Sequence, residues 1–151
     1  DVIFLNPQGM LLRSTTERVS KADITKMDNI FSPSLIQTEI KKKYEIRVFY
    51  LQGKCYAMAI FSQQDKQTRV DYRNYNHQCP NRMVPYILPR AIELKINRFM
   101  KKMNLDTGSI DMIVTPELEY VFLEVNPVGQ YDMVSVPCNY HLHSKIAKIL
   151  I

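Results

Sequence analysis

Two strand-like segments separated by a two-residue turn signal place the strongest limit on the fold. Residues 45–51 read EIRVFYL and residues 54–62 read KCYAMAIFS, with Gln52-Gly53 between them. A two-residue connection of this kind is typical of a β-hairpin, in which the two strands are antiparallel. Side chains along a strand alternate between its faces, so Glu45 and Arg47 are expected on the same face.

The remaining patterns add helices and a second hairpin. Apolar residues recur at three and four positions over 89–103, which predicts an amphipathic helix that begins at Pro89. Residues 110–114 and 120–125 read as two strands joined by a turn around Pro116. Residues 138–151 have helical spacing and are predicted to form one closing helix. Helices packed on an antiparallel sheet give an α+β fold.

The segments between these elements are polar and rich in turn residues. Residues 63–88 are predicted to be a long excursion from the sheet, of the kind that is often functional in a compact domain. The cluster Lys41-Lys42-Lys43 stands between two apolar runs and is interpreted as an exposed hairpin tip.

Composition narrows the class of protein. The chain has 151 residues, 46% of them hydrophobic, which suits one domain or a large piece of one. No stretch approaches the ~20 apolar residues of a membrane span, and no signal peptide is recognisable at the start. Three cysteines without a CxxC pattern predict free thiols and a cytoplasmic protein. The net charge of +5 permits an anionic partner, although solvated lysines explain it equally simply.

Asp111, Glu124 and Asn126 form the sharpest group of polar residues. Glu124 and Asn126 are two positions apart on a predicted strand, so they share a face, and a turn near Pro116 would place Asp111 opposite Glu124. Such oxygen ligands suit Mg²⁺. Turn formation at Asn-Pro is the competing explanation. Glu124 follows Val121-Phe122-Leu123, where a charge is expected to be paired or metal-bound.

Several segments, in order, resemble the C-terminal end of the ATP-grasp fold. The pattern of Asp111 followed by Glu124-Val125-Asn126-Pro127 is similar to that of glutathione synthetase and of the ribosomal-protein S6 glutamate ligase. Residues 36–40 resemble the strand that meets adenine, and 45–48 resemble the acidic-x-Arg-Val strand. Asp71-Tyr72-Arg73 with Tyr75, and residues 124–131, resemble the maturases of graspetides, both the microviridin-type and the "grasp-with-spasm" ligases.

The resemblance implies a role for each matching residue. Asp111, Glu124 and Asn126 would hold Mg²⁺ against the phosphates of ATP, and Arg47 and Arg73 would be catalytic contacts to the transferred phosphate. Glu45 would accept hydrogen bonds from the ribose. The adenine pocket would be formed by Gln37, Thr38, Glu39 and Ile40. A surface ion pair is the competing explanation for Glu45 and Arg47, and solvation is the competing explanation for Arg73.

The implied reaction is ATP-dependent ligation of a carboxylate, which forms ester or amide crosslinks in a ribosomal precursor peptide. A small-molecule carboxylate–amine ligase of the glutathione synthetase type is the alternative enzyme, and a non-catalytic basic module that binds nucleic acid is the alternative binding protein. The expected partner is the precursor peptide, with neither nucleic acid nor a membrane, and a homodimer is possible in the full-length protein.

The resemblance covers only part of a ligase. Residues 34–151 are predicted to be the C-terminal catalytic domain, and residues 1–33 a remnant of the central subdomain, with the N-terminal domain absent. The family's ATP-binding lysines find no match in residues 1–33. The isolated chain is therefore expected to bind ATP weakly and to turn over little or nothing.

Overall fold

A computed structural model describes residues 4–5, 11–12 and 38–150 of the chain. Its centre is a five-stranded antiparallel sheet in the order β5-β4-β3-β6-β7. The strands are β3 (Tyr44–Leu51), β4 (Lys54–Phe61), β5 (Arg82–Tyr86), β6 (Thr107–Val114) and β7 (Tyr120–Asn126). Two short strands, β1 (Phe4–Leu5) and β2 (Leu11–Leu12), pair with each other in a separate sheet. The predicted α+β class and the first hairpin are confirmed.

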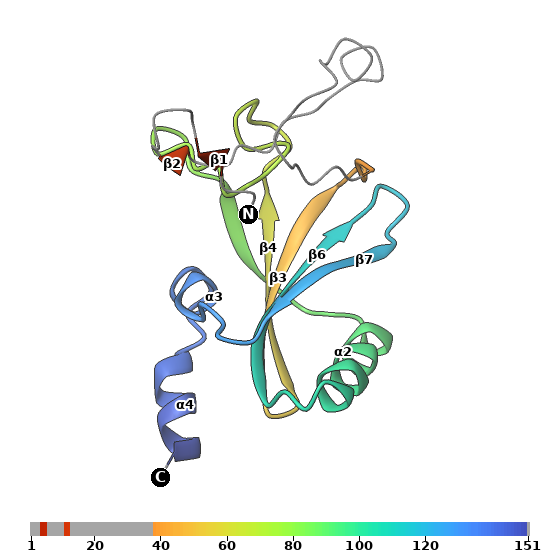
Figure 1. The fold of residues 1–151 in the computed structure, drawn as a ribbon, viewed down its shortest axis with the longest axis vertical. Helices are drawn as coiled ribbons and strands as arrows, with labels where there is room; N and C mark the ends of the chain where they lie inside the picture. Colours follow the sequence, from red (N-terminus) through yellow and green to blue (C-terminus); the bar gives the residue numbers. More distant parts are fainter. Residues whose placement is uncertain (1–3, 6–10, 13–37, 151) are drawn as a thin grey trace.

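Helices lie on both sides of the sheet (Figure 1). Helix α2 (Arg90–Lys102) covers one face, where Ile96 and Met100 pack against the core formed by Ile46, Val48 and their neighbours. Helices α3 (Asp132–Cys138) and α4 (Leu142–Leu150) pack on the other face, where Val134 and Leu142 are part of a second core. Glu45 and Arg47 project from this second face, as their alternation with Ile46 and Val48 predicts.

The prediction of one helix over residues 138–151 was wrong. The chain forms two helices, and the left-handed residues Asn139 (φ 53°) and His141 (φ 52°) separate them. The amide of Tyr140 donates back to the carbonyl of Ser135, which closes α3 with a turn. Helical spacing of the apolar residues continued across this break, so the periodicity did not reveal it.

The prediction of an uninterrupted excursion over 63–88 was also wrong at its end. Residues 82–86 form β5, which pairs with β4 at the edge of the sheet. Pro85 within this strand faces Met58 in the register. Proline cannot donate a ladder hydrogen bond, and an edge strand tolerates it because only one side is paired.

The three cysteines differ in burial, which predicts a selective reaction. Cys79 is exposed, Cys138 is buried, and burial raises the pKa of the half-buried Cys55 to about 12. Since the thiolate is the reactive form, iodoacetamide at pH 8 should alkylate Cys79 first and leave Cys55 largely unmodified until the protein is denatured. Peptide mass spectrometry over a time course measures this order, and faster labelling of Cys55 would contradict the described packing.

Over the described residues, none of the helices has the length and apolarity that crossing a membrane would require.

Candidate active site

The sheet register brings the three predicted metal ligands together. Asp111 on β6 is paired with Glu124 on β7, and Ser109 is paired with Asn126. A bulge beside Asp111 leaves Leu123 without a partner, yet Glu124 and Asn126 keep the same face as Asp111. The fold therefore places Asp111, Glu124 and Asn126 next to one another, as predicted.

Arg47 is a buried cation at the centre of this face. Its Nη1 donates to Oδ1 and Oδ2 of Asp111 at 3.0 and 2.9 Å, and to the hydroxyl of Tyr72 at 3.2 Å. The side chains of Arg47 and Asp111 are only 7% and 13% exposed. The interpretation of Glu45 and Arg47 as an exposed surface pair was therefore wrong, because both residues are buried.

The electrostatic state of Asp111 follows from these neighbours. Burial raises the pKa of the Asp111 carboxyl above its usual value, and the negative charge of Glu124 adds to that effect, while Arg47 opposes it. A divalent cation beside the two carboxylates would relieve the same repulsion. The Nε of Arg47 is buried and has no hydrogen-bond partner among the described residues.

Arg73 reaches the site from the loop between β4 and β5, residues 62–81. It forms a two-pronged pair with Asp71 through Nε and Nη2, and its Nη1 lies 4.0 Å from Oε1 of Glu124. The side chain of Arg73 is 47% exposed. The loop thus adds a second guanidinium at the solvent side of the carboxylate pair.

Glu45 occupies a separate buried position on β3. Its oxygens accept hydrogen bonds from Lys42 Nζ at 2.5 Å and from Ser62 Oγ at 2.7 Å. The side chain of Lys42 is 9% exposed, so the interpretation of Lys41-Lys42-Lys43 as an exposed hairpin tip was wrong for its middle residue. The period of the strand could not reveal Lys42, because it lies before β3 in an irregular segment.

The predicted adenine-binding segment is only partly described. Thr38 and Glu39 are exposed and Ile40 is half-buried, in a stretch of irregular backbone that leads into β3. Gln37 lies outside the described residues.

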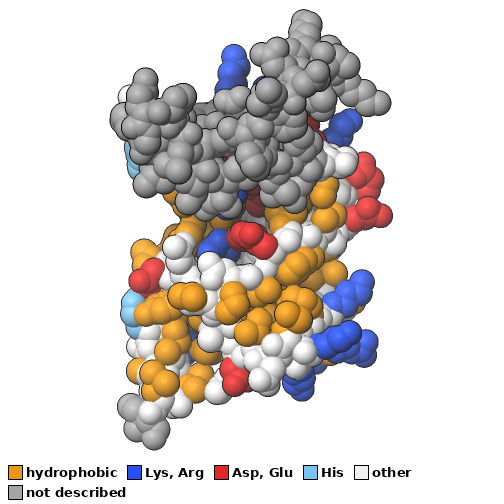
Figure 2. Space-filling view, in the orientation of Figure 1, with side chains coloured by type: hydrophobic (Ala, Val, Ile, Leu, Met, Phe, Trp, Pro, Cys, Tyr) orange, Lys and Arg blue, Asp and Glu red, His pale blue; other side chains and the backbone are white. Residues whose placement is uncertain are grey.

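The argument that Glu124 is a charge in apolar surroundings was wrong. Its side chain is 60% exposed, and the preceding Phe122 and Leu123 are 45% and 49% exposed. β7 is an edge strand, so a run of apolar letters there did not mean burial. In the view of Figure 2, hydrophobic side chains gather in the lower half of the molecule.

Asn126 takes part in the turn that was the competing explanation for it. Its Oδ1 accepts hydrogen bonds from the amides of Val128 at 3.1 Å and of Gly129 at 3.4 Å, which is the turn chemistry expected of Asn-Pro. The longer contact is weak, so this oxygen retains capacity for a cation. Among the described residues no three His, Cys, Asp or Glu side chains gather into a metal-binding group, so a site here would depend on two carboxylates and this amide.

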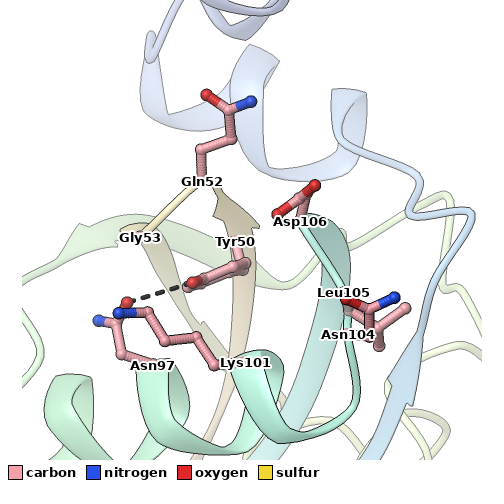
Figure 3. A pocket seen from close by; sticks show the side chains of 8 residues that line it. All are labelled: Tyr50, Gln52, Gly53, Asn97, Lys101, Asn104, Leu105 and Asp106. Carbon is pink, nitrogen blue, oxygen red and sulfur yellow. Dashed lines mark hydrogen bonds between the residues drawn. The ribbon is translucent and has the colours of Figure 1, made fainter.

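A pocket in the described part of the chain lies away from the predicted site residues. It has a volume of about 440 Å³ and lies between α2 and the far ends of β3 and β6, where Tyr50 donates to Asn97 (Figure 3). Gln52, Lys101 and Asp106 also line it, and none of the predicted site residues does. The predicted site instead lies beside the 62–81 loop, with Arg47 and Asp111 buried and Glu124 and Arg73 at its solvent side.

Solved structures with this fold are ATP-grasp ligases. A RiPP-associated ATP-grasp ligase from Chryseobacterium gregarium, in complex with ADP and a leader and core peptide, is 37% identical with a TM-score of 0.59, over 63% of this chain and 28% of its own. The macrocyclase MdnC from Microcystis aeruginosa, bound with the precursor peptide MdnA, is 36% identical with a TM-score of 0.62, over 74% of this chain and 34% of its own. No family model and no curated protein matches the sequence.

A more distant structure shows the fold alone. The ATP-grasp ligase PsnB, complexed with a variant of its minimal precursor, Mg and ADP, is 17% identical with a TM-score of 0.54, over 68% of this chain and 30% of its own.

The chain has the fold of a C-terminal portion of the ATP-grasp ligases. The two structures that are 37% and 36% identical to it are a RiPP-associated ATP-grasp ligase and a macrocyclase, in keeping with the resemblance of its motifs to the graspetide maturases. It spans about a third of the length of the solved structures that it matches.

Proposed function

We propose that this chain is the catalytic end of an ATP-dependent ligase that forms ester or amide crosslinks in a ribosomal precursor peptide. The observation that carries the proposal is the pairing of Asp111 with Glu124 in the sheet register, with Asn126 on the same face and Arg47 beside them. The solved relatives add that ligases with this fold were found with ADP, Mg and precursor peptides.

The donor set fits a magnesium ion. Two carboxylates and an amide are hard oxygen ligands, and magnesium usually completes its shell with water and substrate phosphates. When bound, the ion would neutralise phosphate charge. Asp111, Glu124 and Asn126 would hold it, and a bound cation would oppose the burial and the Glu124 charge that raise the pKa of the Asp111 carboxyl.

The two arginines would bind and orient the reacting phosphate. A guanidinium matches phosphate oxygens in a two-pronged arrangement, and the Nε of Arg47 would donate while Nη1 keeps its bonds to Asp111 and Tyr72. Arg73 would approach from the solvent side. Glu45, kept in place by Lys42 and Ser62, would accept hydrogen bonds from the ribose, and residues 37–40 would meet the adenine.

The chemistry then needs no protein nucleophile. A peptide carboxylate attacks the γ-phosphorus of ATP, ADP leaves, and an acyl phosphate results. A side-chain hydroxyl or amine of the peptide attacks the acyl carbon and expels phosphate, losing its proton to solvent. Catalysis would come from positioning and charge neutralisation.

A direct test uses the complete encoded protein with ATP, Mg²⁺ and candidate precursor peptides. Mass spectrometry should detect loss of one water per crosslink, dependent on both ATP and Mg²⁺. Crosslinking of a free amino acid or small dipeptide in place of the precursor would favour the small-molecule ligase. Failure of a non-hydrolysable ATP analogue with Mg²⁺ to protect the protein from proteolysis, together with protection by an oligonucleotide, would overturn the proposal in favour of nucleic-acid binding.

The length of the chain leads to a further prediction. The 151-residue chain lacks a match to the family's ATP-binding lysines, so it is expected to bind ATP at least about 10-fold more weakly than a chain of the relatives' length, since each lost phosphate contact costs on the order of 1.5–3 kcal/mol. Titration of a fluorescent ATP analogue against both chains measures the ratio. Equal affinity would place the whole nucleotide site within the 151 residues.

A further inference from the structure

The loop at residues 62–81 carries Arg73, and two buried side chains fasten it to β3. Lys42 Nζ donates to the carbonyl oxygen of Val70 at 2.9 Å while it also pairs with Glu45. Two residues further on, the Tyr72 hydroxyl accepts a hydrogen bond from Arg47 Nη1 at 3.2 Å. The loop therefore contacts Arg47 directly and Glu45 through Lys42, and both Glu45 and Arg47 would bind the nucleotide.

These contacts involve side chains with little solvent exposure, unlike ordinary surface contacts. The side chain of Lys42 is 9% exposed and Tyr72 is 6% exposed, whereas the neighbouring Lys41 and Lys43 are exposed. A buried ammonium or hydroxyl is costly unless its donors and acceptors are used. The bond from Lys42 to Val70 and the bond from Arg47 to Tyr72 are therefore conditions for the loop to lie where it does.

The loop also has internal contacts that would keep its shape without β3. Thr68 donates to Asn81, and Asn76 donates to Asp65. Arg73 is locked to Asp71 within the loop itself. Together with the bond from Ser62 to Glu45, the contacts of Lys42 and Tyr72 therefore place the loop on β3, and with it Arg73, which lies 4.0 Å from Glu124.

We propose that Lys42 and Tyr72 are positioning residues that hold the 62–81 loop on β3, and so set the placement of Arg47 and Arg73 relative to the carboxylate pair. The inference rests on the proposed ligase function for its catalytic consequence. Lys42 additionally holds Glu45, so its loss should affect nucleotide affinity, whereas the loss of the Tyr72 hydroxyl should affect turnover alone.

The test compares Tyr72→Phe, Lys42→Met and Lys42→Arg in the complete encoded protein, with Lys41→Met as the matched control. Hydrogen exchange of the amides at 70–74 should become about 10-fold faster in Tyr72→Phe and Lys42→Met, because local opening is easier, while β6 amides are unchanged. Tyr72→Phe should lower kcat about 10-fold and keep KM for ATP within about twofold, since a guanidinium displaced by a fraction of an ångström loses alignment.

Lys42→Met should both lower kcat and raise KM for ATP, and Lys42→Arg should recover most of the loss because it preserves the charge. Unchanged exchange at 70–74 in both Tyr72→Phe and Lys42→Met would overturn the positioning role, as would faster exchange with unchanged kcat. If Lys42→Met fails to fold, Tyr72→Phe alone still tests the positioning role. A wild-type protein without ATP-dependent turnover would refute the ligase function, whereas exchange at 70–74 would still support or overturn the placement of the loop.

Discussion

Glu124→Gln should lower ATP-dependent turnover about 100-fold or more, because loss of a carboxylate ligand weakens the magnesium site and the charge neutralisation that it supplies. Glu124 suits this test because its substitution should have little effect on stability. Its side chain is 60% exposed, and its ion pair with Arg73 is long, at 4.0 Å. An exposed pair of this kind contributes under about 1 kcal/mol to stability, so the variant should fold normally.

The measurement is phosphate release at saturating ATP and peptide, with the melting temperature as a check on folding. Glu117→Gln is the matched control, because Glu117 is an exposed carboxylate in the turn between the same two strands. Turnover of Glu124→Gln equal to that of Glu117→Gln would mean that Glu124 is a solvated edge residue and not a ligand.

Arg47→Met should be the most destabilising substitution in the site. It leaves the Asp111 carboxylate, whose side chain is 13% exposed, without its cation. Removing one partner of a buried ion pair typically costs about 3–5 kcal/mol, which is larger than the cost of losing an exposed pair. Amides of β3 and β6 should therefore exchange about 150- to 5,000-fold faster, because global or sub-global opening becomes easier.

A second substitution separates the lost charge from lost packing. Arg47→Met combined with Asp111→Leu should recover most of the protection, since an apolar pair of similar size avoids the buried charge. Arg98→Met, on the exposed face of α2, serves as the control for loss of an arginine. Equal protection in Arg47→Met and Arg98→Met would contradict a buried Arg47–Asp111 pair.

Much of the fold could be predicted because its strands carry strong local signals. The Gln52-Gly53 turn and the alternation over β3 determined the first hairpin, and apolar spacing determined α2. Residues 138–151 were wrongly predicted as one helix because Cys138 and Leu142 keep a four-residue spacing across the left-handed residues Asn139 and His141. β5 was missed because Pro85 argues against a strand, and only pairing with β4 at the edge makes it acceptable.

The part of the candidate site that lies on the β6–β7 pair could be predicted from the sequence. Asp111 and Glu124 face each other because a single turn fixes their register, which sequence separation can suggest. Lys42 and Tyr72 could not be recognised as contacts to β3, because they depend on where a 20-residue loop folds back. The apolar run before Glu124 did not indicate burial of its charge, since β7 lies at an edge and its apolar residues are partly exposed.

We propose that Asp111, Glu124 and Asn126 together form one binding site for divalent cations, next to the triphosphate of ATP. A crystal structure of the complete encoded protein with Mn²⁺ and a non-hydrolysable ATP analogue tests it, because manganese gives an anomalous signal and takes the same oxygen ligands as magnesium. The account predicts a manganese peak at about 2.1–2.3 Å from oxygens of the three side chains and of the β- and γ-phosphates. A bound nucleotide whose manganese lies away from β6 and β7 would contradict it.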